Sequence, residues 1–447
     1  MFTRIEWLIV GFAVVAMSAC GDTTETDDTA ATTADAPTYY EHVQPILESS
    51  CSSCHSPGNI GPFNFGTYAE AFEYGTLIQS SVNSKRMPPM PPDTENCRPL
   101  DDERVMTDEQ RATVLAWIDG GMPEGDPSLA AAASSESALT AEDSLGSPTS
   151  TVTWGYDFPS TPDLYEEWRC LIVDPGWEEP VHLRAVGVGI DNPAVVHHII
   201  QMLVLPGNDN AIQALEDEDD IPGWWCPNGS RIDGTFSIGG YAPGAQNRPF
   251  PDGSTITLPA GSKIIMQMHY NYATARGVDQ SQTLFWEVDE PSDKRPRGLT
   301  LVNQWFEIPE GAVSYTAEGF STIQEGEGIP TGLSPLSTGE GWAWGASAHL
   351  HARGKEVRID RISPDGTEEC MLHIPNWDFN WQGSYRFKEP MALYNGDVIR
   401  IRCTWDNSYD NQPIGWDGAQ QESRDIGWGD GTFDEMCLGN LQLTDFD

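Results

Sequence analysis

The chain has 447 residues, a length that accommodates about two to four domains with buried cores. It carries 24 Lys and Arg residues against 68 Asp and Glu residues, which gives a formal net charge of −44. Nucleic acids and anionic lipid surfaces are bound through basic patches, so this charge balance argues against both as partners. It indicates instead a solvated acidic surface, as in secreted or salt-exposed proteins.

The N-terminus has the pattern of an export signal. A short charged start precedes an apolar run, residues 8–17, which is too short to span a bilayer as a mature helix. Small residues then precede Cys20, an order that resembles a bacterial lipoprotein signal in which residues 1–19 are removed and Cys20 is lipidated. An ordinary signal peptide cleaved nearby is the alternative. Both interpretations place the mature chain outside the cytoplasm, either lipid-anchored to a membrane of the bacterial cell envelope or extracellular.

Residues 20–37 are acidic, rich in Thr and without bulky apolar side chains, which predicts a disordered tether. Export also changes the interpretation of the nine cysteines, because disulfides persist outside the cytoplasm. With Cys20 assigned to lipid, eight cysteines remain for other roles.

Residues 38–126 are predicted to form a small all-α cytochrome c domain. In the segment "ESSCSSCHSPG", Cys51 and Cys54 can form thioethers to the haem vinyl groups, and His55 is positioned as the proximal iron ligand. A redox C-x-x-C pair or half of a zinc site is the alternative. Because the chain is exported, a His follows directly and no second C-x-x-C is present, we predict one covalently bound haem c.

The sequence around this motif fits a helical domain. Residues 39–48 carry apolar side chains at helical spacing. Thr107 and Gln110 form a capping box before a second apolar stripe, and Gly120 is placed to end that helix.

The sixth iron ligand is expected from the stretch "KRMPPMPP", where stiff prolines hold Met87 and Met90 in a loop. The alternative is that both Met residues only line the haem pocket. In similar fused cytochromes the first Met of an M-P-P pattern is the ligand, which favours Met87. Residues 127–150 are small and polar, so they are predicted to be a flexible linker that closes the domain.

From about Thr151 onward, helical periodicity gives way to strand-like runs between turns rich in Gly, Pro, Asn and Asp. The clearest runs are "VVHHIIQMLVL", "SKIIMQMHYNY", "EVRIDRI" and "GDVIRIRCTW". So many short strands predict a mainly β fold with two antiparallel sandwiches, which we place at residues 151–290 and 291–447.

Five of the nine histidines lie in these strand-like runs: His197, His198, His269, His349 and His351. Neutral imidazoles suit copper, zinc, iron or nickel. His349 and His351 share one strand face, whereas the adjacent His197 and His198 should point to opposite faces. These two converge only at a bulge, a twisted strand end or a sheet edge, so the residues alone leave that site open. His182 and His373 are isolated, and we interpret them as structural.

The motifs "VVHHII", "QMHY", "HLHARGK" and "DEMC", in this order, resemble the copper type II ascorbate-dependent monooxygenases, the family of peptidylglycine α-hydroxylating and dopamine β-monooxygenases. The resemblance runs from about Asp163 to the end of the chain. It implies two tandem jelly-roll β-sandwich domains, each with one copper ion, preceded here by the cytochrome domain.

Carried over by motif, His197, His198 and His269 would bind the electron-transferring copper in the first sandwich. The family keeps this copper apart from the second one across a solvent-filled cleft. An all-His set without thiolate is not a blue-copper site, which would need Cys.

In the second sandwich, His349, His351 and Met436 would bind the catalytic copper, which activates dioxygen. A His2Met set mixes borderline and soft donors, favours Cu(I) and leaves a position open for oxygen. A core Met beside a disulfide is the alternative interpretation of Met436.

The resemblance also implies two disulfides, Cys170–Cys226 in the first sandwich and Cys403–Cys437 in the second. The second bridge would hold the Met ligand at its copper. By elimination, Cys97 and Cys370 remain, and they are candidates for a bridge that ties the haem domain to the second sandwich.

The chain departs from the peptide-amidating members of the family at positions that bind substrate. Ser347 stands where those enzymes use an Arg for the substrate carboxylate, and Leu438 and Asn440 replace their Asn and Tyr. A glycine-extended peptide is therefore an unexpected substrate. Trp377 and Trp381 are candidates for an apolar pocket or, alternatively, for core aromatics.

These features predict an exported monooxygenase that hydroxylates a C–H bond of a small organic substrate with O2. An external donor would supply electrons, and the flexibly linked haem would pass them to the copper of His197, His198 and His269. The alternative is a non-catalytic copper and haem protein for electron transfer or metal handling. The open His2Met set favours the enzyme, since electron transfer alone gains nothing from an open position.

Overall fold

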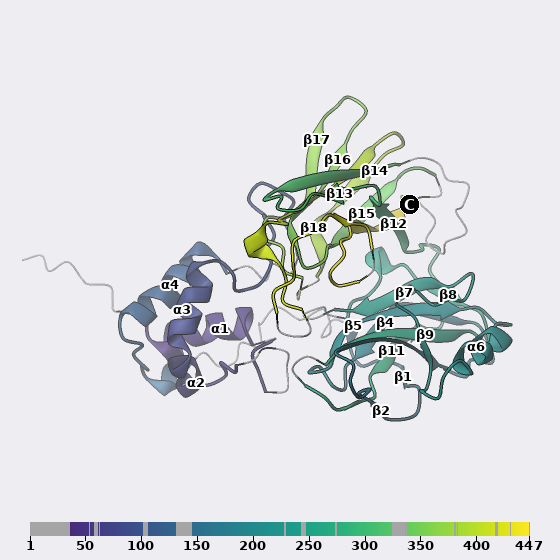
Figure 1. The fold of residues 1–447 in the computed structure, drawn as a ribbon, viewed down its shortest axis with the longest axis horizontal. Helices are drawn as coiled ribbons and strands as arrows, with labels where there is room; N and C mark the ends of the chain where they lie inside the picture. Colours follow the sequence, from purple (N-terminus) through teal and green to yellow (C-terminus); the bar gives the residue numbers. More distant parts are fainter. Residues whose placement is uncertain are drawn as a thin grey trace, which may run out of the picture. The chain divides into compact units, whose positions relative to one another are not determined.

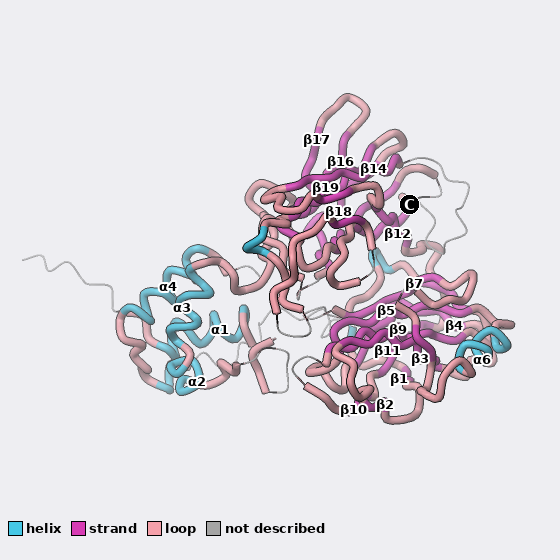
Figure 2. Tube along the Cα trace, in the orientation of Figure 1, coloured by secondary structure: helices cyan, strands magenta, loops and turns pink. Residues whose placement is uncertain are grey.

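A computed structural model gives the fold of the chain. It describes residues 36–447 except residues 53, 58–60, 62, 102–105, 131–144, 228, 243–246, 273–274, 324–335, 337, 380, 382, 416–418, 430 and 447. The predicted signal peptide, the lipidated Cys20 and nearly all of the tether lie outside the described residues. Figure 2 shows the change along the chain from helices to strands.

The N-terminal part, the helical module (residues 36–129), is built from helices around an apolar cluster that includes Val43, Leu47 and Trp117. The side chain of Thr107 caps the last long helix through the predicted box with Gln110, which is confirmed. The helices are η1 (Tyr39–Val43), α1 (Gln44–Ser50), α2 (Tyr68–Glu73), α3 (Gly75–Asn83), α4 (Asp108–Asp119) and η2 (Pro127–Leu129) (Figure 1).

The first β unit (residues 145–288) contains two larger antiparallel sheets, ordered β1-β11-β4-β8 and β6-β3-β9-β5-β7, and the pair β10-β2. Leu183 and Phe285 of one sheet share a buried cluster with Ile199 and Met266 of the other, so the sheets pack face to face. The strands are β1 (Ser150–Val152), β2 (Phe158–Pro159), β3 (Glu166–Val173), β4 (Val181–Gly189), β5 (Val196–Val204), β6 (Trp224–Trp225), β7 (Phe236–Tyr241), β8 (Ile256–Leu258), β9 (Lys263–Asn271), β10 (Val278–Asp279) and β11 (Gln282–Val288).

The second β unit (residues 297–445) repeats this plan with the sheets β12-β21-β15-β18 and β14-β19-β16-β17 and the pair β13-β20. Ala346 and Leu441 of one sheet share a buried cluster with Ile359 and Ile401 of the other. The strands are β12 (Arg297–Val302), β13 (Glu307–Ile308), β14 (Tyr315–Thr322), β15 (Gly341–His349), β16 (Gly354–Ile362), β17 (Glu368–Ile374), β18 (Ser384–Leu393), β19 (Val398–Trp405), β20 (Ile426–Gly427) and β21 (Leu438–Asp445).

The described part of the chain is thus mainly β, as the sequence predicts; the jelly-roll connectivity and the cytochrome fold stay predictions. One helix differs from the prediction of strands alone: α6 (Asp209–Glu216) lies in the first β unit, where its Ile212 is buried. The short helices η3 (Pro251–Gly253) and η4 (Tyr409–Asn411) complete the elements. The predicted boundary at residue 290 falls between β11 and β12.

The end of the predicted linker, residues 127–150, belongs to the first β unit. Leu145 is buried in a cluster with Ala185 and Trp286. The indole N–H of Trp286 donates to the carbonyl of Gly146 over 2.9 Å, and the amide of Thr149 donates to the carbonyl of Phe285 over 2.8 Å. These contacts fix residues 145–150 on the sheet, so the flexible linker of the prediction is shorter at its C-terminal end.

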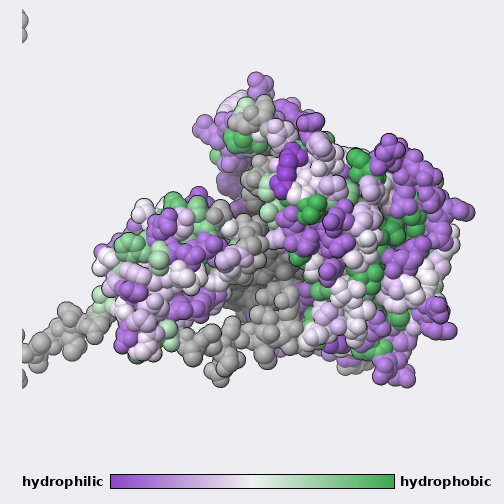
Figure 3. Space-filling view, turned by 90° about the horizontal axis from the view of Figure 1, so that it is seen from below, coloured by the Kyte–Doolittle hydropathy of each residue, from purple (hydrophilic) through white to green (hydrophobic). Residues whose placement is uncertain are grey.

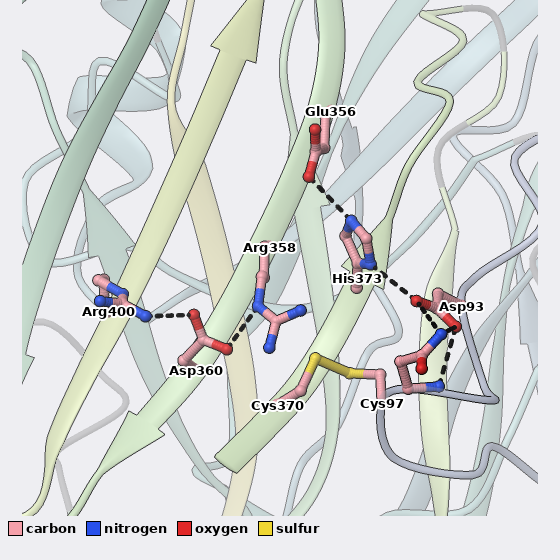
Figure 4. The surroundings of a disulfide bond; sticks show 9 residues. Asp93, Cys97, Glu356, Arg358, Asp360, Cys370, His373 and Arg400 are labelled. Carbon is pink, nitrogen blue, oxygen red and sulfur yellow. Dashed lines mark hydrogen bonds and ion pairs between the residues drawn. A yellow bond between two sulfur atoms is a disulfide. The ribbon is translucent and has the colours of Figure 1, made fainter. Parts of the chain in front are cut away.

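Residues 90–101, here called the strap, are the part of the helical module between α3 and α4 that lies along the second β unit. The disulfide Cys97–Cys370, a candidate pair from the sequence, bridges the strap to β17 (Figure 4). His373 of β17 lies between two carboxylates, with Nδ1 3.2 Å from Oδ2 of Asp93 and Nε2 2.9 Å from Oε1 of Glu356. His373 is therefore structural, as predicted.

Further contacts hold the strap along β18. Arg98 donates to the carbonyls of Glu389 and Pro390 over 3.0 and 2.9 Å, and its guanidinium lies 5.6 Å from the ring centroid of Phe387. Leu100 forms a β-bridge to Phe387 and is buried in the core of the second β unit. The helical module is consequently fastened to this unit as well as linked to the first.

The surface and the cysteines fit the predicted export. Figure 3 shows hydrophilic side chains over most of its coloured surface, with hydrophobic ones scattered among them. Three disulfides, Cys97–Cys370, Cys170–Cys226 and Cys403–Cys437, are present, which fits a secreted or extracellular protein. Among the described helices, none has the length and hydropathy of a membrane span.

We predict that replacing Cys97 and Cys370 by Ser releases the strap and lowers the free energy of unfolding by roughly 2–5 kcal/mol. The backbone amides of Asp93, Asp101 and Lys388, which donate across this contact, should then exchange hydrogen faster. Mass-spectrometric hydrogen exchange measures this. Replacing Cys170 and Cys226 is the matched control, which should leave exchange in the strap unchanged; an unchanged strap in the first variant would contradict the prediction.

Candidate metal centres

The first candidate centre depends on an irregularity in the ladder between β5 and β9. Val196 pairs with Tyr270 and His198 pairs with His269, so the register shifts and His197 is an extra residue on β5. Such a bulge re-aims side chains that regular alternation would send to opposite faces. It meets the condition under which His197 and His198 can converge.

The three imidazoles meet at their Nδ1 atoms. The Nδ1 of His197 lies 3.3 Å from that of His198 and 3.2 Å from that of His269, and the remaining pair is 3.2 Å apart. Each Nδ1 has either one proton to donate or one lone pair to accept with, so a hydrogen bond pairs two of the three atoms and leaves the third unmatched. Nitrogen ligands at about 2.0 Å on a tetrahedral ion lie about 3.3 Å apart. The donor set therefore fits a metal ion held by three His residues.

Burial keeps these imidazoles neutral. It lowers the pKa of His197 to about 4 and holds the pKa values of His198 and His269 well below the ordinary value. Neighbouring imidazoles lower the pKa of His198 and His269 further, since a second positive charge nearby is unfavourable. Neutral imidazole is the form that ligates a metal.

His269 is fixed from behind by β3. Its ring stacks on Trp168 at a centroid distance of 4.3 Å, and its Nε2 lies 2.6 Å from Oε1 of Glu166. Donation from Nε2 to this carboxylate leaves the lone pair on Nδ1, the arrangement of a carboxylate behind a His ligand. Burial raises the pKa of Glu166 to about 7. The same Oε1 accepts from the hydroxyl of Thr432, in the second β unit, over 2.7 Å.

The second candidate centre lies where β15 ends beside β21. His349 pairs with Leu438, the last pair of the β15–β21 ladder, and His351 and Met436 come just beyond it. Ala348 and Leu350 before and between the two His residues, and Cys437 after Met436, belong to the buried core, so alternation directs His349, His351 and Met436 away from that core. The two imidazole centroids are 5.0 Å apart, and Met436 is buried.

Glu435, which the sequence analysis missed although it lies in "DEMC", holds this centre together. Its buried carboxylate accepts from the amides of His351 and Arg353 over 2.9 and 2.7 Å, and from the indole of Trp405 over 2.8 Å. Burial raises the pKa of Glu435 to about 7, while these donors oppose that shift. The side chain of Glu435 thus connects the turn after β15 to the segment that carries Met436.

Two further contacts orient this centre. The Nδ1 of His351 lies 3.2 Å from the carbonyl of Asp434, and only donation from Nδ1 makes a hydrogen bond there, which leaves Nε2 with the lone pair. Burial lowers the pKa of His351 to about 3. The disulfide Cys403–Cys437 fixes the residue after Met436, in the pairing that the family resemblance implies.

Phe379 contacts one His residue of each set. Its ring centroid is 5.7 Å from that of His197 and 5.7 Å from that of His351. No sequence pattern marks Phe379, because its role depends on contact between the two β units. His182 lies 2.8 Å from the hydroxyl of Thr257, and its structural role stays a prediction.

The haem-binding motif forms a tight turn after α1. The amides of Cys54 and His55 donate to the carbonyl of Cys51 over 3.1 and 2.9 Å. Cys51 and Cys54 are the described cysteines without a disulfide, and burial raises the pKa of Cys51 to about 12. The Nδ1 of His55 donates to the carbonyl of Phe63 over 2.9 Å, and the ring stacks on Phe65 at 4.5 Å. This leaves the lone pair on Nε2, so the residues fit a thioether-linked haem with an axial His.

The two candidate Met ligands lie in different surroundings. Met90 is 3% exposed and packs in the apolar core of the second β unit, at the start of the strap. Met87 precedes it and is partly buried. This placement favours Met87, in line with the M-P-P pattern.

Comparison with known proteins identifies relatives for much of the β-rich part. Residues 299–441 match the family described as copper type II ascorbate-dependent monooxygenase, C-terminal domain. The human protein DBH-like monooxygenase protein 1 is 22% identical over 290 residues, which are 61% of this chain and 43% of the human protein. The chain thus spans less than half the length of that relative.

Likeness to solved structures is weak. An allantoicase structure, with 11% identity, covers 56% of this chain and 81% of its own at a TM-score of 0.18. The VP2 subviral particle of infectious bursal disease virus, with 10% identity, covers 68% and 73% at a TM-score of 0.16. Scores this low carry no argument about the fold. The sequence matches, in contrast, support the copper type II monooxygenase family and point to a copper-dependent monooxygenase-like protein.

Proposed function

We propose that the chain is an exported copper-dependent monooxygenase that hydroxylates a C–H bond of a small organic substrate. The overall reaction consumes the C–H compound, O2, two electrons and two protons, and it yields the alcohol and water. The observation that carries the proposal is the convergence of three imidazoles close to His349 and His351 of the candidate His2Met set, with Phe379 in contact with one His of each set. The family match over the second β unit supports it.

His197, His198 and His269 would hold one copper ion, and His349, His351 and Met436 the other. When bound, the coppers would supply one-electron redox chemistry and, at the His2Met set, activation of dioxygen. Glu166 orients the imidazole of His269, and Glu435 positions the turn that carries His351. Phe379 contacts His197 of one set and His351 of the other.

For the helical module we propose covalent attachment of haem c through Cys51 and Cys54, with His55 and Met87 as axial ligands. The group would supply a one-electron store near the copper centres, filled by an external donor. Support comes from the two unbridged thiols and from the hydrogen bond that leaves Nε2 of His55 available. Lipid anchoring at Cys20 completes the proposal for a chain that works in the bacterial cell envelope.

The proposed role of Met436 as a copper ligand can be tested by removing its sulfur atom. Met436→Ile should remove the copper–sulfur scattering seen by X-ray absorption of the reduced protein and abolish hydroxylated product. Copper at His197, His198 and His269 should remain, because that set lies on β5 and β9. Product would be sought by comparing metabolite mixtures treated with and without O2.

Met371→Ile, a buried Met in the core of the same unit, is the matched control and should keep the sulfur signal. A full signal and full turnover in Met436→Ile would exclude Met436 as a ligand.

Glu166→Gln should weaken copper binding at the three-His set roughly 10- to 100-fold, since outer carboxylates orient and strengthen His ligands. Binding at the His2Met set should not change. A chelator-competition titration measures both affinities. Glu178→Gln, an exposed acid in the same β unit, is the control; equal affinities for Glu166→Gln and wild type would refute the orienting role.

Variants of the two Cys residues test the covalent attachment of haem, and variants of Met87 and Met90 test which Met binds the iron. Replacing Cys51 and Cys54 by Ser should abolish the haem that stays attached after denaturation, as read by a pyridine haemochrome spectrum. Met87→Ala should lower the haem reduction potential, because a thioether ligand raises it. Met90→Ala should leave the potential unchanged but cost about 2–5 kcal/mol of stability as a core truncation. The opposite pattern would make Met90 the ligand.

A further inference from the structure

A cavity of about 680 Å³ lies beside the candidate metal centres and draws its walls from all three parts of the chain. A volume in this range holds a small organic molecule. The helical module contributes Lys85 and Arg86, the first β unit Asn271, and the second β unit Trp377, Phe379 and Ile414, among others.

The cavity borders both donor sets through Phe379, although no donor residue is in its lining. Phe379, one of its walls, contacts His197 and His351. Asn271 lies on β9 two residues after His269, and the lining residue Ala352 directly follows His351. A molecule in the cavity would therefore be separated from the candidate centres by Phe379.

The walls are apolar near the second β unit. Trp377 packs so closely over Gly354 that a Cβ there would lie 2.4 Å from the indole ring, so glycine is needed for this wall. Ile414 is 61% exposed, a large apolar side chain at the cavity without full cover. Such surfaces favour an apolar body in the ligand.

The part of the cavity lining that comes from the helical module carries positive charge. Lys85 and Arg86 are exposed neighbours, in a chain that has 24 basic against 68 acidic residues. The nearest carboxylate oxygen of Asp108 is 3.9 Å from Lys85, an exposed pair that contributes little. Arg86 donates to the hydroxyl of Ser81 over 2.9 Å, a neutral partner. Asp378 is the acidic residue in the lining, so the two cations outnumber it.

We propose that this cavity binds an organic carboxylate with an apolar body, its anionic group at Lys85 and Arg86 and its apolar part toward Phe379. The helical module thereby takes part in substrate selection as well as in electron supply. Ser347 has no charge to offer a carboxylate, so the cations come from another part of the chain. The proposal rests on the proposed function for turnover, but binding itself needs no copper.

The test uses the copper-free, otherwise complete chain and two probes of equal shape, phenylpropanoate and phenylpropanamide. Ligand-observed NMR titration gives both dissociation constants. Wild type should bind the carboxylate roughly fivefold more tightly than the amide, and added salt should reduce this preference. Lys85→Gln with Arg86→Gln should remove the preference, while amide binding is retained.

Two controls separate charge from shape. Lys388→Gln with Arg295→Gln makes the same change of net charge at exposed residues outside the cavity lining and should keep the preference. Ile414→Ser should weaken both probes about equally. Equal affinities for the two probes in wild type would overturn the proposal, whatever the copper experiments show.

The haem propionates are the other carboxylates that these cations could hold. If the Lys85 and Arg86 double variant shifts the haem potential but keeps the preference for phenylpropanoate, the cations serve the haem and the proposal is wrong. Loss of the preference with an unchanged potential supports it, even if no hydroxylated product is ever found.

Discussion

The one-residue bulge at His197 is the constraint on which the candidate metal chemistry depends. Regular alternation along β5 would place the imidazoles of His197 and His198 on opposite faces, and only one of them would reach His269. The bulge brings three Nδ1 atoms together, and one hydrogen bond among them can pair only two. Leaving a polar atom unpaired in a core is costly, so a metal ion bound there would stabilise the folded strand pair.

Two largely buried carboxylates support the candidate metal centres, and different partners compensate the negative charge of each. Glu166 faces an imidazole and a hydroxyl from the other β unit, whereas Glu435 faces two backbone amides and an indole. The short stretch 432–436 contributes to both centres, since it begins at the Thr432 contact and ends at Met436. Displacement of this stretch would therefore disturb both donor sets at once.

Local signals in the sequence predict local features well. The capping box of Thr107, the shared face of His349 and His351 and the β-rich character of residues beyond 150 all follow from spacing. The bulge at His197 does not, because register depends on which strand lies opposite. Phe379 shows no signal either, since its contacts with both His sets come from tertiary packing.

The strap was the harder part to predict for a related reason. Its length and composition resemble those of a loop in a separate haem domain, and only the leftover pair Cys97 and Cys370 indicated a connection. The burial of Met90 in another unit's core required the three-dimensional fold. Similarly, α6 is only eight residues long, so its apolar face, with Ile212 and Leu215, is a short signal among the strand-like runs.

The Cys97–Cys370 bridge also determines the covalent topology of the molecule. It closes a ring with a sequence separation of 273 residues, and this ring contains the entire first β unit. A single backbone cut anywhere inside the ring opens it without dividing the protein, because both fragments stay joined through sulfur. For an exported protein exposed to proteases, this means that one nick between the parts releases no fragment until a reductant breaks the bridge.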